Sequence, residues 1–190
     1  GHADYLLDNI SITDGETTYT EDFEECKDYG ESAGANPAMS YFETVRQSDS
    51  KQLILSYPYE AGVNKLAFEN AAKGDRLMGK TKIEKEDKYI GDMQEVFSAS
   101  FELSFSESVA ETEKVAYVFG VDSVAGNPFS DCWAYEMSRT GGKLVKYDEN
   151  GAVTALENNE NAFSSAEAGG TTITLSLSKN GTFTAKENDE

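Results

Sequence analysis

The residues of this 190-residue chain that could do chemistry are mainly carboxylates, because the sequence lacks the usual nucleophile–base pairs. The single histidine, His2, follows Gly1 in what looks like the remnant of an expression tag. Without another histidine there is no Ser-His or Cys-His pair and no histidine-based metal site. G-x-S-x-G, P-loop and G-x-G-x-x-G motifs are also missing. Paired carboxylates are then the only catalytic route, since glycoside hydrolysis needs two of them across the scissile bond.

Aromatic residues favour ligand binding over catalysis. The chain has 10 Tyr, 10 Phe and 1 Trp, and the C–H groups of a sugar pack on flat rings while polar side chains bind its hydroxyls. The residues predicted to contact such a ligand are Trp133, Tyr135, Tyr57, Tyr59, Tyr89 and Glu102. Trp133 and Tyr135 recur at period two with Met137, so packing in the core is the competing interpretation for both.

The charge excludes some partners. Lys plus Arg is 16 and Asp plus Glu is 35, a net charge of −19. A field of that sign repels phosphate backbones and anionic membrane surfaces, so we expect neither nucleic acid nor membrane as a partner. Neutral glycans, cations and basic proteins remain open. No apolar run is long enough to span a bilayer.

The two cysteines, Cys26 and Cys132, leave two interpretations open. They pair, which would close a loop worth roughly 4 kcal/mol and suit an extracellular setting. Alternatively, both are packed, inert thiols.

The elements that must position these residues are β-strands. Phe97 to Phe105 alternates strictly between apolar and polar residues, the pattern of a strand with one buried and one solvated face. Its polar face, made by Ser98, Ser100, Glu102 and Ser104, is the one that could meet a sugar. Further strands are expected at 5–12, 17–23, 41–45, 52–57, 65–68, 77–83, 115–119, 132–137, 143–147, 152–156, 171–177 and 182–185.

Turn residues predict how these strands connect. Thr13-Asp-Gly15 and Asn180-Gly181 indicate hairpins, as do the turns at 140–142 and 148–151. Strands 41–45 and 52–57 are expected to pair across Ser48-Asp-Ser50. Residues 158–170 are predicted to form a loop, and 186–190 a frayed tail. We expect residues 1–190 to form one all-β domain.

The order of these signals from about Asp92 to Ala185 resembles that of concanavalin A-like, or laminin-G-like, jelly-roll sandwiches. The resemblance implies a lectin-like, two-sheet antiparallel β-sandwich of the carbohydrate-binding-module type. The segment Leu7-Asp-Asn-Ile-Ser-Ile12 resembles the closing strand of such domains, although here it stands at the start of the chain.

The resemblance also directs attention to particular carboxylates. Sandwich glycosidases of this kind often carry E-x-D-x-x-E, and the nearest segment, Asp92-Met-Gln-Glu95, has Ile90 at the first position. Related lectin-like domains often hold structural calcium with loop oxygens. The resemblance therefore implies a calcium site, with Asp22, Asp8 and Asp122 as candidate ligands; solvated acids are the alternative.

These observations predict a non-catalytic carbohydrate-binding module that holds a neutral poly- or oligosaccharide. We expect a monomeric module of a larger protein, located outside the cell or on a bacterial cell surface. A structural or adhesive domain is the alternative, and a glycoside hydrolase is a further one.

Overall fold

In the computed structural model the chain is all-β, and its strands form antiparallel sheets. The structure describes residues 3–13, 16–24, 39–45, 53–55, 65–71, 73–79, 96–106, 108–120, 129–162 and 170–189. No helix occurs within these ranges, so in the described part of the chain none could cross a membrane.

Thirteen strands make up the described structure. They are β1 (Ala3–Thr13), β2 (Thr18–Glu21), β3 (Phe42–Val45), β4 (Leu53–Leu55), β5 (Leu66–Ala71), β6 (Arg76–Gly79), β7 (Phe97–Phe105), β8 (Val115–Phe119), β9 (Cys132–Met137), β10 (Gly141–Tyr147), β11 (Val153–Ala162), β12 (Thr171–Leu177) and β13 (Phe183–Glu187).

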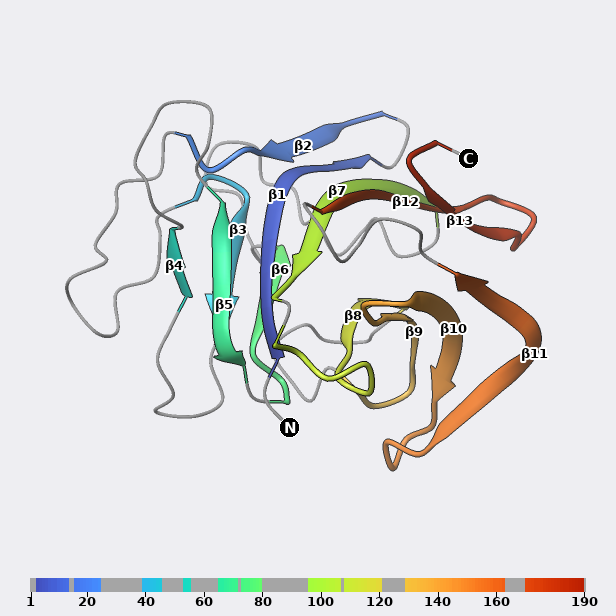
Figure 1. The fold of residues 1–190 in the computed structure, drawn as a ribbon. Helices are drawn as coiled ribbons and strands as arrows, with labels where there is room; N and C mark the ends of the chain where they lie inside the picture. Colours follow the sequence, from blue (N-terminus) through green and yellow to red (C-terminus); the bar gives the residue numbers. More distant parts are fainter. Residues whose placement is uncertain are drawn as a thin grey trace.

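The largest sheet has seven strands in the order β13-β12-β7-β1-β5-β4, with β2 also paired to β1. A four-stranded sheet has the order β11-β10-β9-β8, and β3 pairs with β6 in a two-stranded sheet. In Figure 1, β1 runs beside β5 and then bends sharply toward β2. The strand therefore joins the two halves of the seven-stranded sheet.

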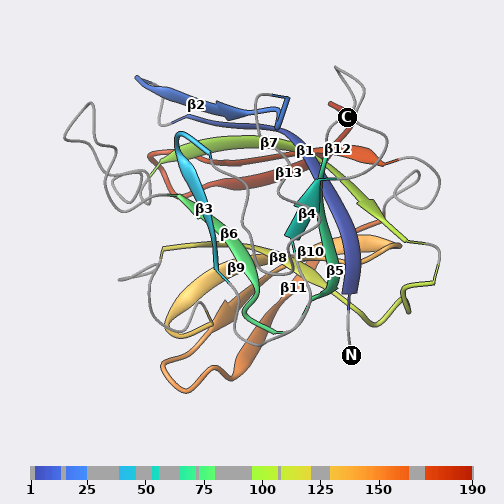
Figure 2. The ribbon, with the colours of Figure 1, turned by 90° about the vertical axis from the view of Figure 1, so that its left-hand side faces the viewer.

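Residues of both the seven-stranded and the four-stranded sheet line the main core, and in Figure 2 the strands β7, β12 and β13 lie above β8 to β11. Aromatic rings meet across this core. Phe97 lies 5.1 Å from Phe119, Phe101 stacks on Tyr117 at 6.1 Å, and Phe119 stacks on Phe183 at 5.5 Å, measured between ring centroids. Within the described ranges, the Phe and Tyr rings thus contribute to packing.

The strand β7 confirms the prediction from its sequence. Its residues alternate without exception between buried and half-buried from Phe97 to Phe105. It lies inside the sheet between β1 and β12, so its apolar face contributes to the core while both backbone edges are paired. The predicted hairpins β1–β2, β9–β10, β10–β11 and β12–β13 are also present.

Other predictions about strand pairing were wrong. The strand at 42–45 pairs with β6, whereas β4 pairs with β5, so the segments around Ser48-Asp-Ser50 do not form the expected hairpin. The strand β11 continues to Ala162, through residues predicted as a loop, because backbone pairing with β10 does not require apolar side chains. Lys186 and Glu187, expected in a frayed tail, pair with Thr174 and Ile173.

Candidate functional site

The seven-stranded sheet has one face on the main core and an opposite face, here called the outer face. Core positions cross five strands in one register row, Tyr19, Ile12, Ala99, Leu175 and Ala185. On each strand, the residues directly before and after this core position belong to the outer face, because successive side chains of a strand point to opposite sides. None of the hydroxyl residues in the rows described next is buried.

Two rows of the outer face consist almost entirely of hydroxyl side chains. The first hydroxyl row crosses β2, β1, β7, β12 and β13 through Thr18, Thr13, Ser98, Ser176 and Thr184. The second hydroxyl row crosses the same strands through Thr20, Ser11, Ser100, Thr174 and Lys186. Each member is the direct cross-strand partner of the next, so the hydroxyls lie side by side.

Some of these hydroxyls bind one another. Ser176 and Thr184 share a hydrogen bond of 2.5 Å, and Thr174 donates a long one of 3.5 Å to Ser100. A hydroxyl can donate one hydrogen bond and accept two. Such pairs therefore retain acceptor capacity for a ligand or for water.

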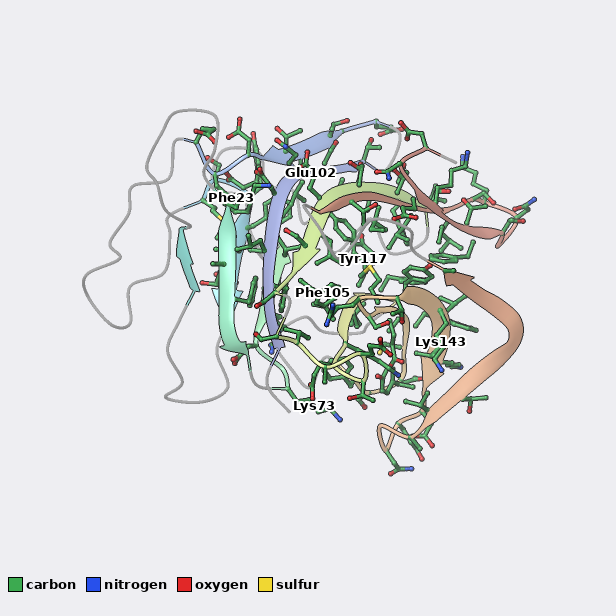
Figure 3. The ribbon with its side chains drawn as sticks, viewed as in Figure 1. Phe23, Lys73, Glu102, Phe105, Tyr117 and Lys143 are labelled. Carbon is green, nitrogen blue, oxygen red and sulfur yellow. The ribbon has the colours of Figure 1, made fainter. Side chains whose placement is uncertain are left out.

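A polar cluster adjoins these rows, composed of Asp8, Asn9, Lys65 and Glu102 and here called the bulge cluster. The Asn9 side-chain nitrogen donates to Glu102 Oε1 at 2.8 Å. Lys65 Nζ lies 3.8 Å from Glu102 Oε2 and 4.0 Å from Asp8 Oδ2. Asp8 and Glu102 are direct cross-strand partners, and Thr172 continues their row. Figure 3 shows Glu102 on the upper side of the sheet.

A β-bulge in β1 shapes this cluster. Between the pairs Asp8↔Glu102 and Ser11↔Ser100, β1 has one residue more than β7. Asn9 takes φ 47° there, a left-handed conformation that asparagine tolerates better than most residues. Its backbone N–H donates to Asp8 Oδ1 at 2.8 Å. The bulge bends β1 and presents the Asn9 side chain to solvent.

Asp8 is only 7% exposed. Burial raises the pKa of its carboxyl above the ordinary value. The Asn9 backbone N–H and the Lys65 ammonium act in the opposite direction, while the charges of Glu102 and Glu24 add to the rise. In the described ion pairs, Lys65 is the cation that contacts both Asp8 and Glu102.

The aromatic residues predicted as a platform lie elsewhere. Tyr135 is 1% exposed and packs 5.7 Å from Phe183, so its ring belongs to the core. It also lies directly over Gly142, where an added Cβ would approach the ring to 2.6 Å. Trp133 is half-buried at the edge of the main core, with Lys146 Nζ 5.7 Å from its ring centroid. Both residues are in the four-stranded sheet, away from the outer face.

Other predicted site residues fall outside the described residues or stand apart. Tyr57, Tyr59, Tyr89, Asp122, Asp92 and Glu95 lie outside the described ranges. Asp22 is exposed and accepts from the Glu24 backbone N–H at 3.1 Å. Within the described ranges no group of three or more His, Cys, Asp or Glu residues could hold a metal ion. Calcium therefore stays a prediction from the sequence.

A second polar cluster lies on the far side of the four-stranded sheet. Glu136 is 9% exposed, accepts from the Tyr147 hydroxyl at 2.5 Å and binds Lys114 Nζ at 3.0 Å. Burial and the Glu136 carboxylate raise the pKa of Tyr147 above its ordinary value. Both oxygens of Glu136 are thus engaged, which suits a structural role.

Cys132 is buried beside this cluster. Burial, reinforced by the charge of Asp131, raises the pKa of the thiol. Cys26, its candidate partner, lies outside the described residues.

The alternation in β7 predicted one strand of the outer face, with its polar residues including Glu102, but the rows were not predicted. The signal for the other strands was present as Ser or Thr at every second position, in Thr18-Tyr-Thr20, Ser11-Ile-Thr13 and Thr172-Ile-Thr-Leu-Ser176. What no sequence pattern showed is that these segments are neighbours in register.

In comparisons with known proteins, no protein-family model, curated protein or solved structure matches the chain.

Proposed function

We propose that this chain is a non-catalytic carbohydrate-binding domain, built as a lectin-like jelly-roll sandwich, that holds a neutral poly- or oligosaccharide on its outer face. The observation that carries the proposal is the set of register rows on that face. Hydroxyls, the Glu102 carboxylate, the Asn9 amide and the ammonium groups of Lys65 and Lys186 gather there, with the buried Asp8 beside them.

The chemistry of these groups matches that of a sugar. Sugar hydroxyls both donate and accept, and the Ser and Thr hydroxyls of the rows do the same. Glu102 accepts strongly because it is charged, while Lys65 and Asn9 donate. Convergent polar groups of this kind orient a ligand and provide specificity. Stacking on Tyr57, Tyr59 or Tyr89 stays part of the proposal as a prediction.

The distribution of charge supports a neutral ligand. Two carboxylates, Asp8 and Glu102, lie beside the Lys65 ammonium, and Lys186 adds a second positive charge in the second hydroxyl row, although the chain as a whole carries −19. The overall negative charge repels polyanions at long range. We place the domain outside the cell or on a cell surface, where polysaccharides are accessible, as a monomeric module.

Isothermal titration calorimetry against soluble glucans, xylans and mannans tests this proposal. We expect at least one glycan to bind, and Glu102→Ala to weaken its affinity by about ten- to a hundredfold, since a hydrogen bond to a charged group contributes about 1.5–3 kcal/mol. Glu149→Ala removes an exposed carboxylate from the β10–β11 turn and is the matched control, with unchanged affinity expected.

A reducing-sugar assay on the same mixtures tests the absence of catalysis. Release of sugar ends would indicate a glycoside hydrolase. Failure of every glycan to bind would refute the proposal and favour a structural or adhesive domain.

A further inference from the structure

We infer that the two hydroxyl rows bind a single extended polysaccharide chain that crosses the strands of the sheet, rather than a chain end or a crystalline surface. This inference rests on the proposed function and adds to it the form of the ligand. The bulge cluster would contact one sugar, whereas the rows provide contacts for several in succession.

The scarcity of charged residues in the hydroxyl rows indicates that these rows bind a ligand as well as water. Charged residues make up 27% of the chain, and solvent-facing positions normally carry more than the average share. The ten positions of the two hydroxyl rows include one charged residue, Lys186. A face that contacts only water would be expected to carry more charged residues than this one. A row of neutral hydroxyls suits a neutral partner rich in hydroxyls.

The length of the rows sets the size of the ligand. Each row crosses five strands, and hydrogen-bonded neighbours lie about 4.8 Å apart, so a row spans about 19 Å. One pyranose residue extends a chain by close to one strand spacing. Successive sugars would then meet successive strands, and about four or five sugars would fill a row.

The direction of the chain follows from the same spacing. Within a row each hydroxyl has a neighbour at about 4.8 Å, whereas along a strand the next outer-face side chain is about 6.8 Å away. The spacing between neighbouring hydroxyls along a row is close to the length of one sugar, so each strand of the row could contact one sugar. Along a single strand, the three outer-face positions that Ser98, Ser100 and Glu102 occupy change from hydroxyl to carboxylate. The rows are therefore the more uniform track.

The twist of the sheet excludes a flat ligand. Adjacent strands rotate by about 20–25°, so four steps across five strands accumulate about 80–100°. A rigid plane, such as the face of a crystalline polysaccharide, would touch one or two strands and leave the remaining hydroxyls without contact. A single chain can twist about its glycosidic bonds and follow the whole row.

The test uses the intact chain and a series of neutral oligosaccharides from one to six sugars, taken from the glycan that binds best. We expect affinity to rise with each added sugar up to four or five and then to level off. Thr18→Val and Thr184→Val remove hydroxyls at opposite ends of the first hydroxyl row. Each should weaken binding of the hexasaccharide by about two- to tenfold and leave the disaccharide unaffected.

Thr112→Val is the matched control, an exposed threonine in the connection between β7 and β8, and should bind every oligosaccharide like the wild type. Valine retains the β-branched shape, and thermal melting checks that each variant is folded. A pull-down with microcrystalline polysaccharide should leave the protein in solution.

The possible outcomes separate this inference from the proposed function. Affinity that does not depend on length, with Glu102→Ala still weakening it, would overturn the inference and leave carbohydrate binding intact. Quantitative pull-down by the crystalline material would also overturn it. Absence of any glycan binding would refute both.

Discussion

Asp8 is a carboxylate in a position where carboxylates are rare. It is 7% exposed and lies on the polar side of a sheet, beside the carboxylate of Glu102 and 4.0 Å from the Lys65 ammonium. Burial of a charge costs free energy that this distant ion pair offsets only in part. Its side chain nevertheless caps the Asn9 backbone N–H and so helps to hold the bulge.

Replacement of Asp8 by asparagine tests this account at the level of one residue. Because the folded-state pKa is raised, the folded protein binds a proton more readily than the unfolded chain does, and the charged carboxylate disfavours folding at neutral pH. Asp8→Asn keeps an acceptor for the Asn9 N–H. We expect it to be at least as stable as the wild type at pH 7, with its advantage shrinking as the pH falls through the folded-state pKa toward 3.8.

Urea denaturation across that pH range measures the difference. Asp22→Asn is the matched control, since Asp22 also accepts a backbone N–H but is exposed, and it likewise removes one negative charge. If Asp8→Asn were less stable than the wild type, and increasingly so toward neutral pH, the attraction between Asp8 and Lys65 would outweigh the cost of burying the Asp8 charge.

At the scale of elements, the bulge in β1 decides where the candidate site lies. The segment Tyr5-Leu-Leu-Asp-Asn-Ile-Ser-Ile12 predicted a strand, and the strand is present. The sequence did not indicate that one extra residue would interrupt its pairing with β7. A bulge depends on the partner strand, which lies about ninety residues away. Sequence reasoning limited to local patterns therefore could not locate it.

Substitutions at Asn9 probe the bulge. Asn9→Val places a β-branched residue at φ 47°, and we expect it to lower the free energy of unfolding by about 1–2 kcal/mol. Asn9→Gly accepts this backbone conformation freely and also loses the hydrogen bond to Glu102, so it separates strain from contact loss. Equal stability of the two variants in urea would show that the backbone conformation carries no strain.

The strands β3 and β4 illustrate a different limit of prediction. Both were expected from their composition, and both exist, but β3 pairs with β6 rather than with β4, and β4 pairs with β5. Short strands of three or four residues have too little pattern to select a partner.

At the scale of the whole molecule, net charge is the dominant electrostatic property. A charge of −19 on 190 residues produces self-repulsion that opposes compaction. Raising ionic strength from about 0.01 M to about 0.15 M shortens the screening length from about 30 Å to about 8 Å. We therefore expect the melting temperature to rise over this range, as measured by differential scanning calorimetry.

Affinity for a neutral glycan should change little over the same range, because the ligand carries no charge. Sodium and potassium chloride should act alike, since the effect is screening. A melting temperature independent of salt would mean that local ion pairs, such as Lys114–Glu136, offset the overall repulsion.

By itself, the sequence determined that this protein is all-β, that Phe97 to Phe105 is an amphipathic strand inside a sheet, and where four hairpins turn. These features depend on period-two patterns and on turn residues, which act over a few residues. Only the tertiary structure decided that Tyr135 is buried, that Glu102 meets Lys65 and Asn9, and that the Ser and Thr positions of five strands align. Alignment depends on register between distant strands, and register is set by packing of the whole core.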